Sequence, residues 1–326
     1  MAAPPARLEL ALTPTPILRL DRLSRRLGVE VHVKRDDLTG LLESGSKIRK
    51  LEFLVGEALQ QGADTLIAGG TLGSNGGRAV AAVAARLGLR AVLAVRGARP
   101  AQYDGDLLLE RLLGAEVHFD AGPDAPERLA AEIRARGGRP YVVPEGGDGA
   151  VGALGYLECA VELTEQGHHG APRFDAVVIT AVSGGSHAGL ILGKQLVGLP
   201  GEIVGVPVAR PAEAVRRHVT ETVAAAIRRY GFAIDVPKAV HVLDGYQADT
   251  DTPAAAADAD LEALVSLARE EGILLDPLYT ARAFRALVDT LARDRKALGQ
   301  RVCFIHTGGI YGVFPERARL GRLLDR

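Results

Sequence analysis

Short runs of valine, isoleucine and leucine alternate with longer helical patterns along most of the chain, and this alternation constrains the fold more than any other feature. Runs such as Ala176-Val177-Val178-Ile179 are apolar at every position. Such runs are typical of strands that are buried on both faces of a parallel sheet. We expect strands at residues 31–34, 65–68, 91–95, 116–119, 141–143, 176–180, 203–206, 240–243 and 302–305.

Helical patterns occupy the stretches between these runs. They cover residues 47–61, 74–87, 106–113, 126–136, 152–165, 186–196, 211–229, 258–271, 279–293 and 316–324. Alternation of strands and helices predicts an α/β fold with doubly wound, mostly parallel sheets and with ligands at the carboxyl ends of the strands. A chain of 326 residues is long for one core and suits two domains.

The composition argues against several functional classes. The 39 Lys and Arg residues balance 40 Asp and Glu residues to a net charge of −1, which disfavours a nucleic-acid partner or a membrane-surface patch. Cys159 and Cys303 lie far apart and form no Cys/His cluster, so we expect neither a disulfide framework nor a metal site. The first residues lack a signal-peptide pattern, and the apolar runs end well before the roughly 18 residues of a transmembrane helix. A soluble, cytoplasmic protein is expected.

Lys47 is the first candidate for chemistry. Among six lysines it alone directly follows a Gly-Ser turn, Gly45-Ser46, and opens a helix. The helix dipole disfavours an ammonium at that position and so favours the neutral amine, which can attack an aldehyde. For an isolated Gly-Ser-Lys, a solvated lysine on an amphipathic helix is the commoner case.

A glycine-rich turn over residues 69–77 follows a strand and leads into an alanine-rich helix. Ser74 and Asn75 fall at the helix start, where side chains and free backbone N–H groups can hold a carboxylate. Ordinary N-capping explains the same two residues.

A second turn, residues 181–189, also lies between a buried strand and a helix. Its glycines let the backbone wrap a phosphate, and the helix dipole adds to the attraction. The turn matches neither GxGxxG nor GxxxxGK[ST], which disfavours a dinucleotide or nucleoside-triphosphate site. A tight turn without a ligand remains the alternative.

Two further elements complete the pattern. Asp276-Pro277 indicates a helix start with Tyr279 and Thr280 in its first turn, although a core tyrosine and a capping threonine fit equally well. His306 precedes a glycine cluster at 308–312, and a lone histidine of this kind is more often structural than catalytic. An amine, a carboxylate holder and a phosphate cup on one parallel frame suggest pyridoxal 5'-phosphate.

Taken together, these residues resemble the pyridoxal-phosphate enzymes of the tryptophan-synthase-β fold type (fold type II). Within them the chain is most similar to the D-cysteine desulfhydrase and 1-aminocyclopropane-1-carboxylate deaminase family. The resemblance covers most of the chain and rests on residues 13–16, 34–40, 45–52, 74–75, 144–155, 276–279 and 308–309. These motifs are highly specific together and weak singly.

The resemblance implies a role for each matching residue. Lys47 is the Schiff-base lysine and the shuttle for the α-proton, Ser74 lies near the substrate carboxylate, and Tyr279 lies against the ring or the substrate. Asn75 hydrogen-bonds the ring hydroxyl and Thr280 faces the pyridine nitrogen. The phosphate is held by Ser183, Gly184, Gly185 and Ser186 with the backbone of His187 and Ala188.

It also implies the domain organisation. Residues 1–46 plus 161–326 form the larger, cofactor-binding domain, and residues 47–160 form a smaller, mobile α/β domain that carries the lysine and the substrate-carboxylate loop. Relatives are usually homodimers that act on a small amino acid.

Several positions depart from the family pattern. Thr280 stands where the deaminases carry glutamate, and a hydroxyl stabilises a protonated pyridine less well than a carboxylate. Ser46 replaces the usual asparagine, and Gly73 and Gly76 replace larger residues. A tyrosine-bearing segment of the family is replaced by residues 247–253, with Thr250 or Asp251 near the tyrosine position.

These features predict a lyase that performs α,β-elimination on a small β-substituted amino acid, releasing pyruvate and ammonia. A thiol leaving group gives a D-cysteine desulfhydrase-like enzyme, and a sulfite leaving group gives an L-cysteate sulfo-lyase. A β-replacement synthase, a cyclopropane deaminase and a catalytically vestigial cofactor-binding protein are the alternatives. A nucleotide-binding α/β protein is disfavoured because a nucleotide fingerprint is absent from the sequence.

Overall fold

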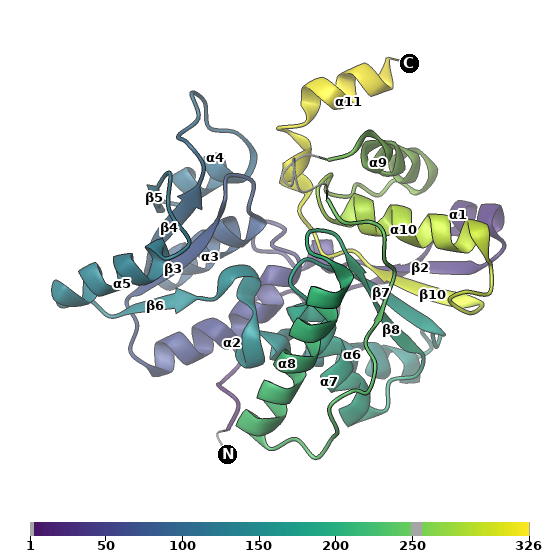
Figure 1. Ribbon diagram of the computed structural model, residues 1–326, viewed down its shortest axis with the longest axis horizontal. Helices are drawn as coiled ribbons and strands as arrows, with labels where there is room; N and C mark the ends of the chain where they lie inside the picture. The colour runs from purple at the N-terminus through teal and green to yellow at the C-terminus, as the bar shows by residue number, and fades with distance from the viewer. Residues whose placement is uncertain (1–2, 249–255, 326) are drawn as a thin grey trace.

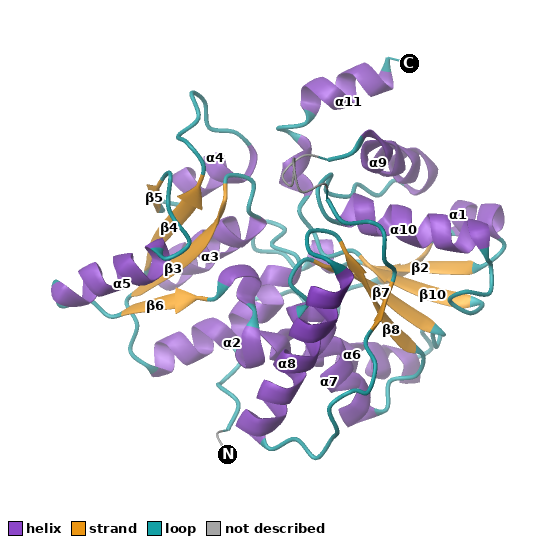
Figure 2. Ribbon diagram, in the orientation of Figure 1, coloured by secondary structure: helices purple, strands orange, loops and turns teal. Residues whose placement is uncertain are grey.

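The computed structural model describes residues 3–248 and 256–325, and its strands form two separate sheets (Figures 1 and 2). The larger sheet has the order β1-β2-β10-β7-β8-β9. Its strands are β1 (Ile17–Arg19), β2 (Glu30–Lys34), β7 (Ala176–Ala181), β8 (Glu202–Pro207), β9 (His241–Val242) and β10 (Arg301–Ile305). All neighbouring pairs are parallel except β1 with β2.

The central strand β7 shows why its sequence is apolar at every position. Val177 and Ile179 belong to one hydrophobic cluster, whereas Ala176 and Val178 belong to another on the opposite face. All four side chains are buried. Because successive strand residues point to opposite faces, a strand covered on both sides needs apolar residues at odd and even positions alike.

Helices cover both faces of the larger sheet. The helices α1 (Asp21–Leu27), α9 (Asp258–Glu271) and α10 (Thr280–Arg293) contribute buried side chains to one face. The opposite face is covered by α6 (Gly149–His168), α7 (Gly185–Val197) and α8 (Ala212–Tyr230). Figure 1 shows these two helical layers on either side of the strands. The last helix, α11 (Arg317–Leu324), follows the short 3-10 helix η3 (Ile310–Val313).

The smaller sheet is parallel throughout, with the order β5-β4-β3-β6. It consists of β3 (Thr65–Thr71), β4 (Arg90–Arg96), β5 (Glu116–His118) and β6 (Pro140–Val143). Helix α5 (Ala125–Ala135) packs on one face, with Leu129 and Ile133 against Ile67 and Val92. Helices α2 (Ser46–Gln60), α3 (Asn75–Leu87) and α4 (Gly105–Leu112) complete this part of the molecule.

The structure confirms the predicted fold class and an element at each of the nineteen expected positions, within a few residues at their ends. The prediction missed β1 and α1, and it began α6 three residues late. All strands of the smaller sheet fall between residues 65 and 143. The domain division stays a prediction, and its border at residue 160 lies inside the continuous helix α6. None of the helices in the described residues combines the length and the apolar composition that a membrane span requires.

Candidate active site

The predicted site residues follow the carboxyl ends of strands in both sheets. Strand β3 leads to Ser74 and Asn75, β7 leads to the loop before α7, and β10 leads to the glycine cluster after His306. Strand β6 leads through the 3-10 helix η2 (Glu145–Gly147) to α6. In doubly wound folds this edge of the sheet is where ligands bind.

Lys47 occupies the first turn of α2, as predicted. The preceding Gly45 has φ 59°, and a Cβ there would overlap the carbonyl of Thr307. The Ser46 N–H donates to the same carbonyl at 2.9 Å. The helix start is therefore joined directly to the loop that follows β10.

The amine of Lys47 has an altered acidity. Burial lowers its pKa from 10.5 to about 8, and the positive charge of Lys50 acts in the same direction. The carboxylates of Asp148 and Asp276 oppose this shift. A larger fraction of the amine is therefore neutral near neutral pH than for an ordinary lysine.

Lys47 and Ser74 line one cavity of about 30 Å³, together with Gly76 and the loop after β6. A Cβ added to Gly76 would lie 3.8 Å from Lys47 Cε and 3.4 Å from Ser74 Oγ. Ser74 is the N-cap residue of α3, yet its hydroxyl makes no capping hydrogen bond in the part of the chain described. Ordinary capping therefore does not account for the Ser74 side chain.

Asn75 lies beside Gly309, and Thr280 contacts Asp276, which lies beside the same glycine. A Cβ on Gly309 would lie 3.2 Å from Asn75 Nδ2 and 2.8 Å from Asp276 Cβ, so the glycine permits this close approach. The Thr280 hydroxyl accepts a hydrogen bond from the Asp276 N–H at 2.8 Å, and the Thr280 N–H donates to Asp276 Oδ2 at 2.7 Å. These two hydrogen bonds stabilise the first turn of α10. Thr280 therefore has a structural role in addition to its predicted contact with the pyridine nitrogen.

Tyr279 precedes this helix and is partly buried. Burial raises the pKa of its phenol to about 12, and Asp276, Asp106 and Glu145 act in the same direction. The phenol is therefore protonated at neutral pH and can donate a hydrogen bond. Thr250 and Asp251, which stand near the family's missing tyrosine, lie outside the described residues.

The predicted phosphate loop surrounds the start of α7. Gly184 has φ 113°, and a Cβ there would lie 2.7 Å from Val219 Cγ2. The Ala188 N–H donates to the Gly184 carbonyl at 2.8 Å, so this N–H is already used within α7. The first-turn N–H groups, up to that of His187, are the ones a helix start leaves without an intrahelical acceptor.

The His187 side chain is fully buried and faces away from this loop, toward Gly205 in β8. Burial lowers the pKa of the ring to about 4. A backbone hydrogen bond with Ile203 opposes this shift only in part. A neutral imidazole is the form that burial favours, so only the backbone of His187 is suited to a phosphate.

Three residues beside the loop were missed by the sequence analysis. Lys50 Nζ lies 3.3 Å from Asp148 Oδ1 and donates to the Gly146 carbonyl at 2.9 Å. His218 Nε2, from α8, lies 3.4 Å from Asp148 Oδ2. Lys50 follows Lys47 by one helical turn, so both lysines lie on the same face of α2. This spacing is the sequence feature that could have identified Lys50 as a site residue. His218 and Asp148 carry no comparable local signal.

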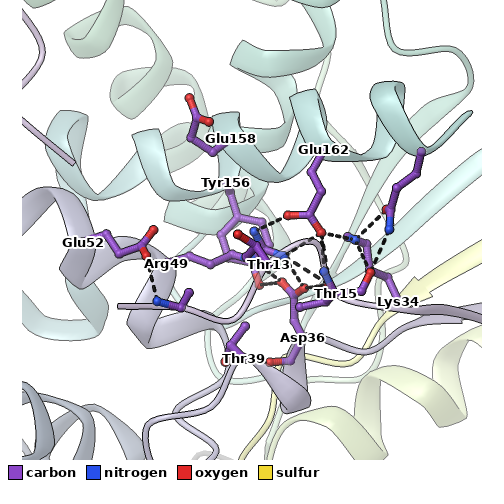
Figure 3. A network of polar contacts seen from close by, with 12 residues as sticks. Thr13, Thr15, Lys34, Asp36, Thr39, Arg49, Glu52, Tyr156, Glu158 and Glu162 are labelled. Atoms are coloured by element: carbon purple, nitrogen blue, oxygen red, sulfur yellow. Dashed lines mark hydrogen bonds and ion pairs between the residues drawn. The ribbon is translucent and has the colours of Figure 1, made fainter. Parts of the chain in front are cut away.

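A buried charge network fixes α2 from the other side (Figure 3). Arg49 Nη2 lies 2.8 Å from Asp36 Oδ1, and Arg49 Nη1 lies 2.8 Å from Glu162 Oε2 on α6. Glu162 Oε1 also accepts from Lys34 Nζ on β2 at 2.5 Å. Burial disfavours ionisation of Glu162, but Arg49 and Lys34 outweigh it and lower its pKa. Through these ion pairs, the segment after β2 and helix α6 both hold α2, the helix that carries Lys47.

His306 has the structural role expected from the sequence. Its Nε2 lies 2.7 Å from the Leu274 carbonyl, and its Nδ1 accepts from the Gly308 N–H at 3.3 Å. Both ring nitrogens are thus used by the backbone around the glycine cluster.

Larger hollows lie elsewhere on the molecule. One of about 650 Å³ is lined by Lys194, Glu202 and His241 at the amino end of β8. This is the opposite edge of the sheet from the candidate site, and size alone does not make it a ligand site.

The residues at the strand ends suit the pyridoxal phosphate that the resemblance implies. They supply an amine with a lowered pKa, a serine at a helix start and a loop whose glycines a Cβ would obstruct. Such a donor set fits an aldehyde-bearing, phosphorylated ligand.

Comparisons with known proteins agree with this fit. Residues 8–308 match the family model described as "Pyridoxal-phosphate dependent enzyme". A D-cysteine desulfhydrase of Serratia proteamaculans is 40% identical over 317 residues, covering 94% of this chain and 95% of the relative. The D-cysteine desulfhydrase of Yersinia enterocolitica is 41% identical over 320 residues, with 94% and 95% coverage. The crystal structure of an ACC deaminase homologue matches with a TM-score of 0.88 and 35% identity, covering 98% of this chain and 96% of that one.

Proposed function

The chain belongs to the pyridoxal-phosphate dependent enzymes, in the family of D-cysteine desulfhydrases and 1-aminocyclopropane-1-carboxylate deaminases, and we propose that it is a lyase acting on a small amino acid with a leaving group at Cβ. D-cysteine is the proposed substrate. Cysteine and water would then give pyruvate, ammonia and hydrogen sulfide.

One observation carries this proposal. Lys47, with its pKa lowered to about 8, opens into the same cavity as Ser74 at the carboxyl end of β3. A neutral amine beside a group suited to a carboxylate is what a reaction at the α-carbon of an amino acid needs.

Each residue has a proposed task. Bound pyridoxal phosphate supplies an electrophilic aldehyde and a ring that accepts electrons. Lys47 Nζ would hold the aldehyde carbon until the substrate amine displaces it, and the freed amine would then be able to take the proton from the substrate α-carbon. Ser74 and the N–H groups at the start of α3 orient the substrate carboxylate. Asn75 and Thr280 would hold the ring of the cofactor, and Tyr279 would lie against the substrate.

Thr280 favours elimination of a thiol over opening of a cyclopropane ring. A carboxylate at this position would keep the pyridine nitrogen protonated and so strengthen electron withdrawal. The Thr280 hydroxyl carries no such charge, and it already bonds to the backbone of Asp276. Loss of a good leaving group from Cβ needs less electron withdrawal by the ring than cleavage of a carbon–carbon bond does.

The test is a lyase screen with cofactor-loaded protein. D-cysteine, L-cysteine, L-cysteate and 1-aminocyclopropane-1-carboxylate are supplied in turn, and pyruvate, sulfide, sulfite and 2-oxobutanoate are measured. Equal amounts of pyruvate and sulfide from D-cysteine are expected, and a Lys47→Ala variant should release neither. Loading without turnover of any substrate would instead indicate a binding protein.

Two further predictions concern the context of the reaction. By resemblance to its relatives we propose that the chain forms a homodimer in the cytoplasm. Light scattering of the purified protein tests the assembly state.

A further inference from the structure

Asp148 lies between the loop after β6 and the loop before α7. A Cβ added to Gly185 would overlap Asp148 Oδ1, so the carboxylate lies directly against the predicted phosphate loop. Asp148 is also the N-cap residue of α6, but its side chain makes no capping hydrogen bond within the described chain. Capping of its own helix therefore does not explain why a carboxylate lies there.

The carboxylate instead engages the polar groups that surround the loop. Lys50 Nζ lies 3.3 Å from Oδ1, and the His218 ring lies 3.4 Å from Oδ2. Burial disfavours the ionised form of Asp148, but Lys50, His218 and the Ser183 hydroxyl outweigh burial and hold its pKa below the usual range. Asp148 is thus a largely buried anion held by groups from α2, α8 and the phosphate loop.

A bound phosphate needs the same partners. A phosphate at the start of α7 would draw on the Ser183 hydroxyl and on the nearby ammonium of Lys50, whose Nζ lies 3.3 Å from a Cβ built on Gly185. Two anions that share one cation repel each other and divide its hydrogen bonds. The loop therefore already contains a competitor for the ligand it is predicted to bind.

We propose that Asp148 is an internal anion that occupies the Lys50 and Ser183 side of the phosphate cup and thereby weakens the binding of the cofactor phosphate. This inference rests on the proposed function, because it takes residues 183–187 as the phosphate site. When phosphate binds, Lys50 and Ser183 exchange the carboxylate for phosphate oxygens. The cofactor should therefore dissociate more readily than from a phosphate site that has hydrogen-bond donors but no carboxylate.

A purely structural role for Asp148 predicts the opposite result. In that case the carboxylate would hold Lys50 and His218 in position for the phosphate. Replacing it by an amide would then release both groups and weaken phosphate binding.

The experiment compares Asp148→Asn and Asp148→Ser with the unchanged protein. The probes are pyridoxamine 5'-phosphate and pyridoxamine, which lack the aldehyde and so bind without reacting with Lys47. Their dissociation constants are measured by calorimetry on cofactor-free full-length protein. The ratio of the two dissociation constants gives the contribution of the phosphate group to binding, because the ring is common to both probes. A Glu132→Gln variant is the matched control, since this exposed carboxylate lies on α5 and its nearest charged partner is Arg128, 3.9 Å away.

We expect the preference for the phosphorylated probe to rise by about tenfold or more in both Asp148 variants, equivalent to about 1.4 kcal/mol. Glu132→Gln should leave the ratio unchanged. An unchanged or smaller ratio in a folded Asp148 variant would overturn the inference, and the serine variant decides the matter if the asparagine variant does not fold. If the unchanged protein binds neither probe, the failure lies with the proposed cofactor site instead.

Discussion

The amine of Lys47 experiences charges of both signs. Lys50 and burial favour the neutral form, while Asp148 and Asp276 favour the ammonium. The net effect brings the pKa from 10.5 to about 8. Only a neutral amine can attack the cofactor aldehyde, so the acidity of this one residue should control how fast the protein takes up its cofactor.

We therefore predict that the rate of cofactor loading rises with pH and levels off above a midpoint near 8. Stopped-flow absorbance with pyridoxal phosphate measures this rate, and Lys47→Ala should show no covalent loading at any pH. A midpoint near 10.5, the ordinary value, would show that the fold leaves the amine unperturbed.

Glu110 is a second residue with an unusual acidity. Burial raises its pKa from 4.5 to about 8, Asp106 adds to the rise and Arg78 opposes it. Between pH 4.5 and about pH 8, Glu110 is protonated in the folded state but ionised in the unfolded state. Stability should therefore fall as pH rises through this window.

Glu110→Gln removes this titration. We expect the variant to lose less stability than the unchanged protein between pH 5 and pH 8, by about 3 kcal/mol in the free energy of unfolding. Urea denaturation at the two pH values measures the difference, with Glu132→Gln as an exposed control. Parallel losses in Glu110→Gln and the unchanged protein would contradict the assigned acidity.

At the scale of elements, α2 is held by charges as well as by apolar packing. Its Arg49 pairs with Asp36 and with Glu162, and Glu162 also pairs with Lys34 (Figure 3). Removing the shared carboxylate would leave two buried cations short of a partner. A buried pair broken in this way costs about 3–5 kcal/mol.

Glu162→Gln should accordingly lower the free energy of unfolding by about 3 kcal/mol. Glu158→Gln, one turn earlier on α6, should change it by less than about 1 kcal/mol because Glu158 is 36% exposed and pairs with Arg7 at the surface. Chemical denaturation at neutral pH compares the two variants. Equal effects would mean that the network adds little to the attachment of α2.

The elements and the site were predictable to different degrees. Strands such as β7 were recognisable because an apolar residue at every position marks burial on both faces. Lys47 and Ser74 were recognisable because each opens a helix after a glycine-rich turn. The strand β1 was missed because it has only three residues, two of which are exposed. His218 and Asp148 were missed because they meet through the packing of α6, α7 and α8, which local patterns do not encode.

At the scale of the whole molecule, the candidate site lies where the carboxyl ends of two sheets converge. The cavity at Lys47 measures about 30 Å³, whereas small-molecule sites usually enclose about 300–1,000 Å³. Entry of a cofactor therefore requires the segments around Lys47 to move apart, and its binding should then restrain them.

Hydrogen exchange tests where this restraint falls. Adding pyridoxal phosphate should slow exchange in peptides that cover residues 73–76, 144–148 and 183–187. Peptides that line the 650 Å³ hollow, around Lys194 and His241, should be unaffected. Protection confined to the hollow would place the ligand at the amino end of β8 and refute the assignment.

One turn of α2 carries three cations that face three different surroundings. Lys47 faces the cavity, Arg49 faces the buried network, and Lys50 lies between Gly146, after β6, and Gly185, at the start of α7. A mutation in this turn would disturb several contacts together, so little sequence drift is tolerable there. Gly73 and Gly76 belong to a different segment, and a Cβ added to Gly73 would make only an ordinary van der Waals contact, 4.0 Å from Leu278 Cδ1. Evolution can therefore alter substrate preference through that segment while the turn of α2 stays unaltered.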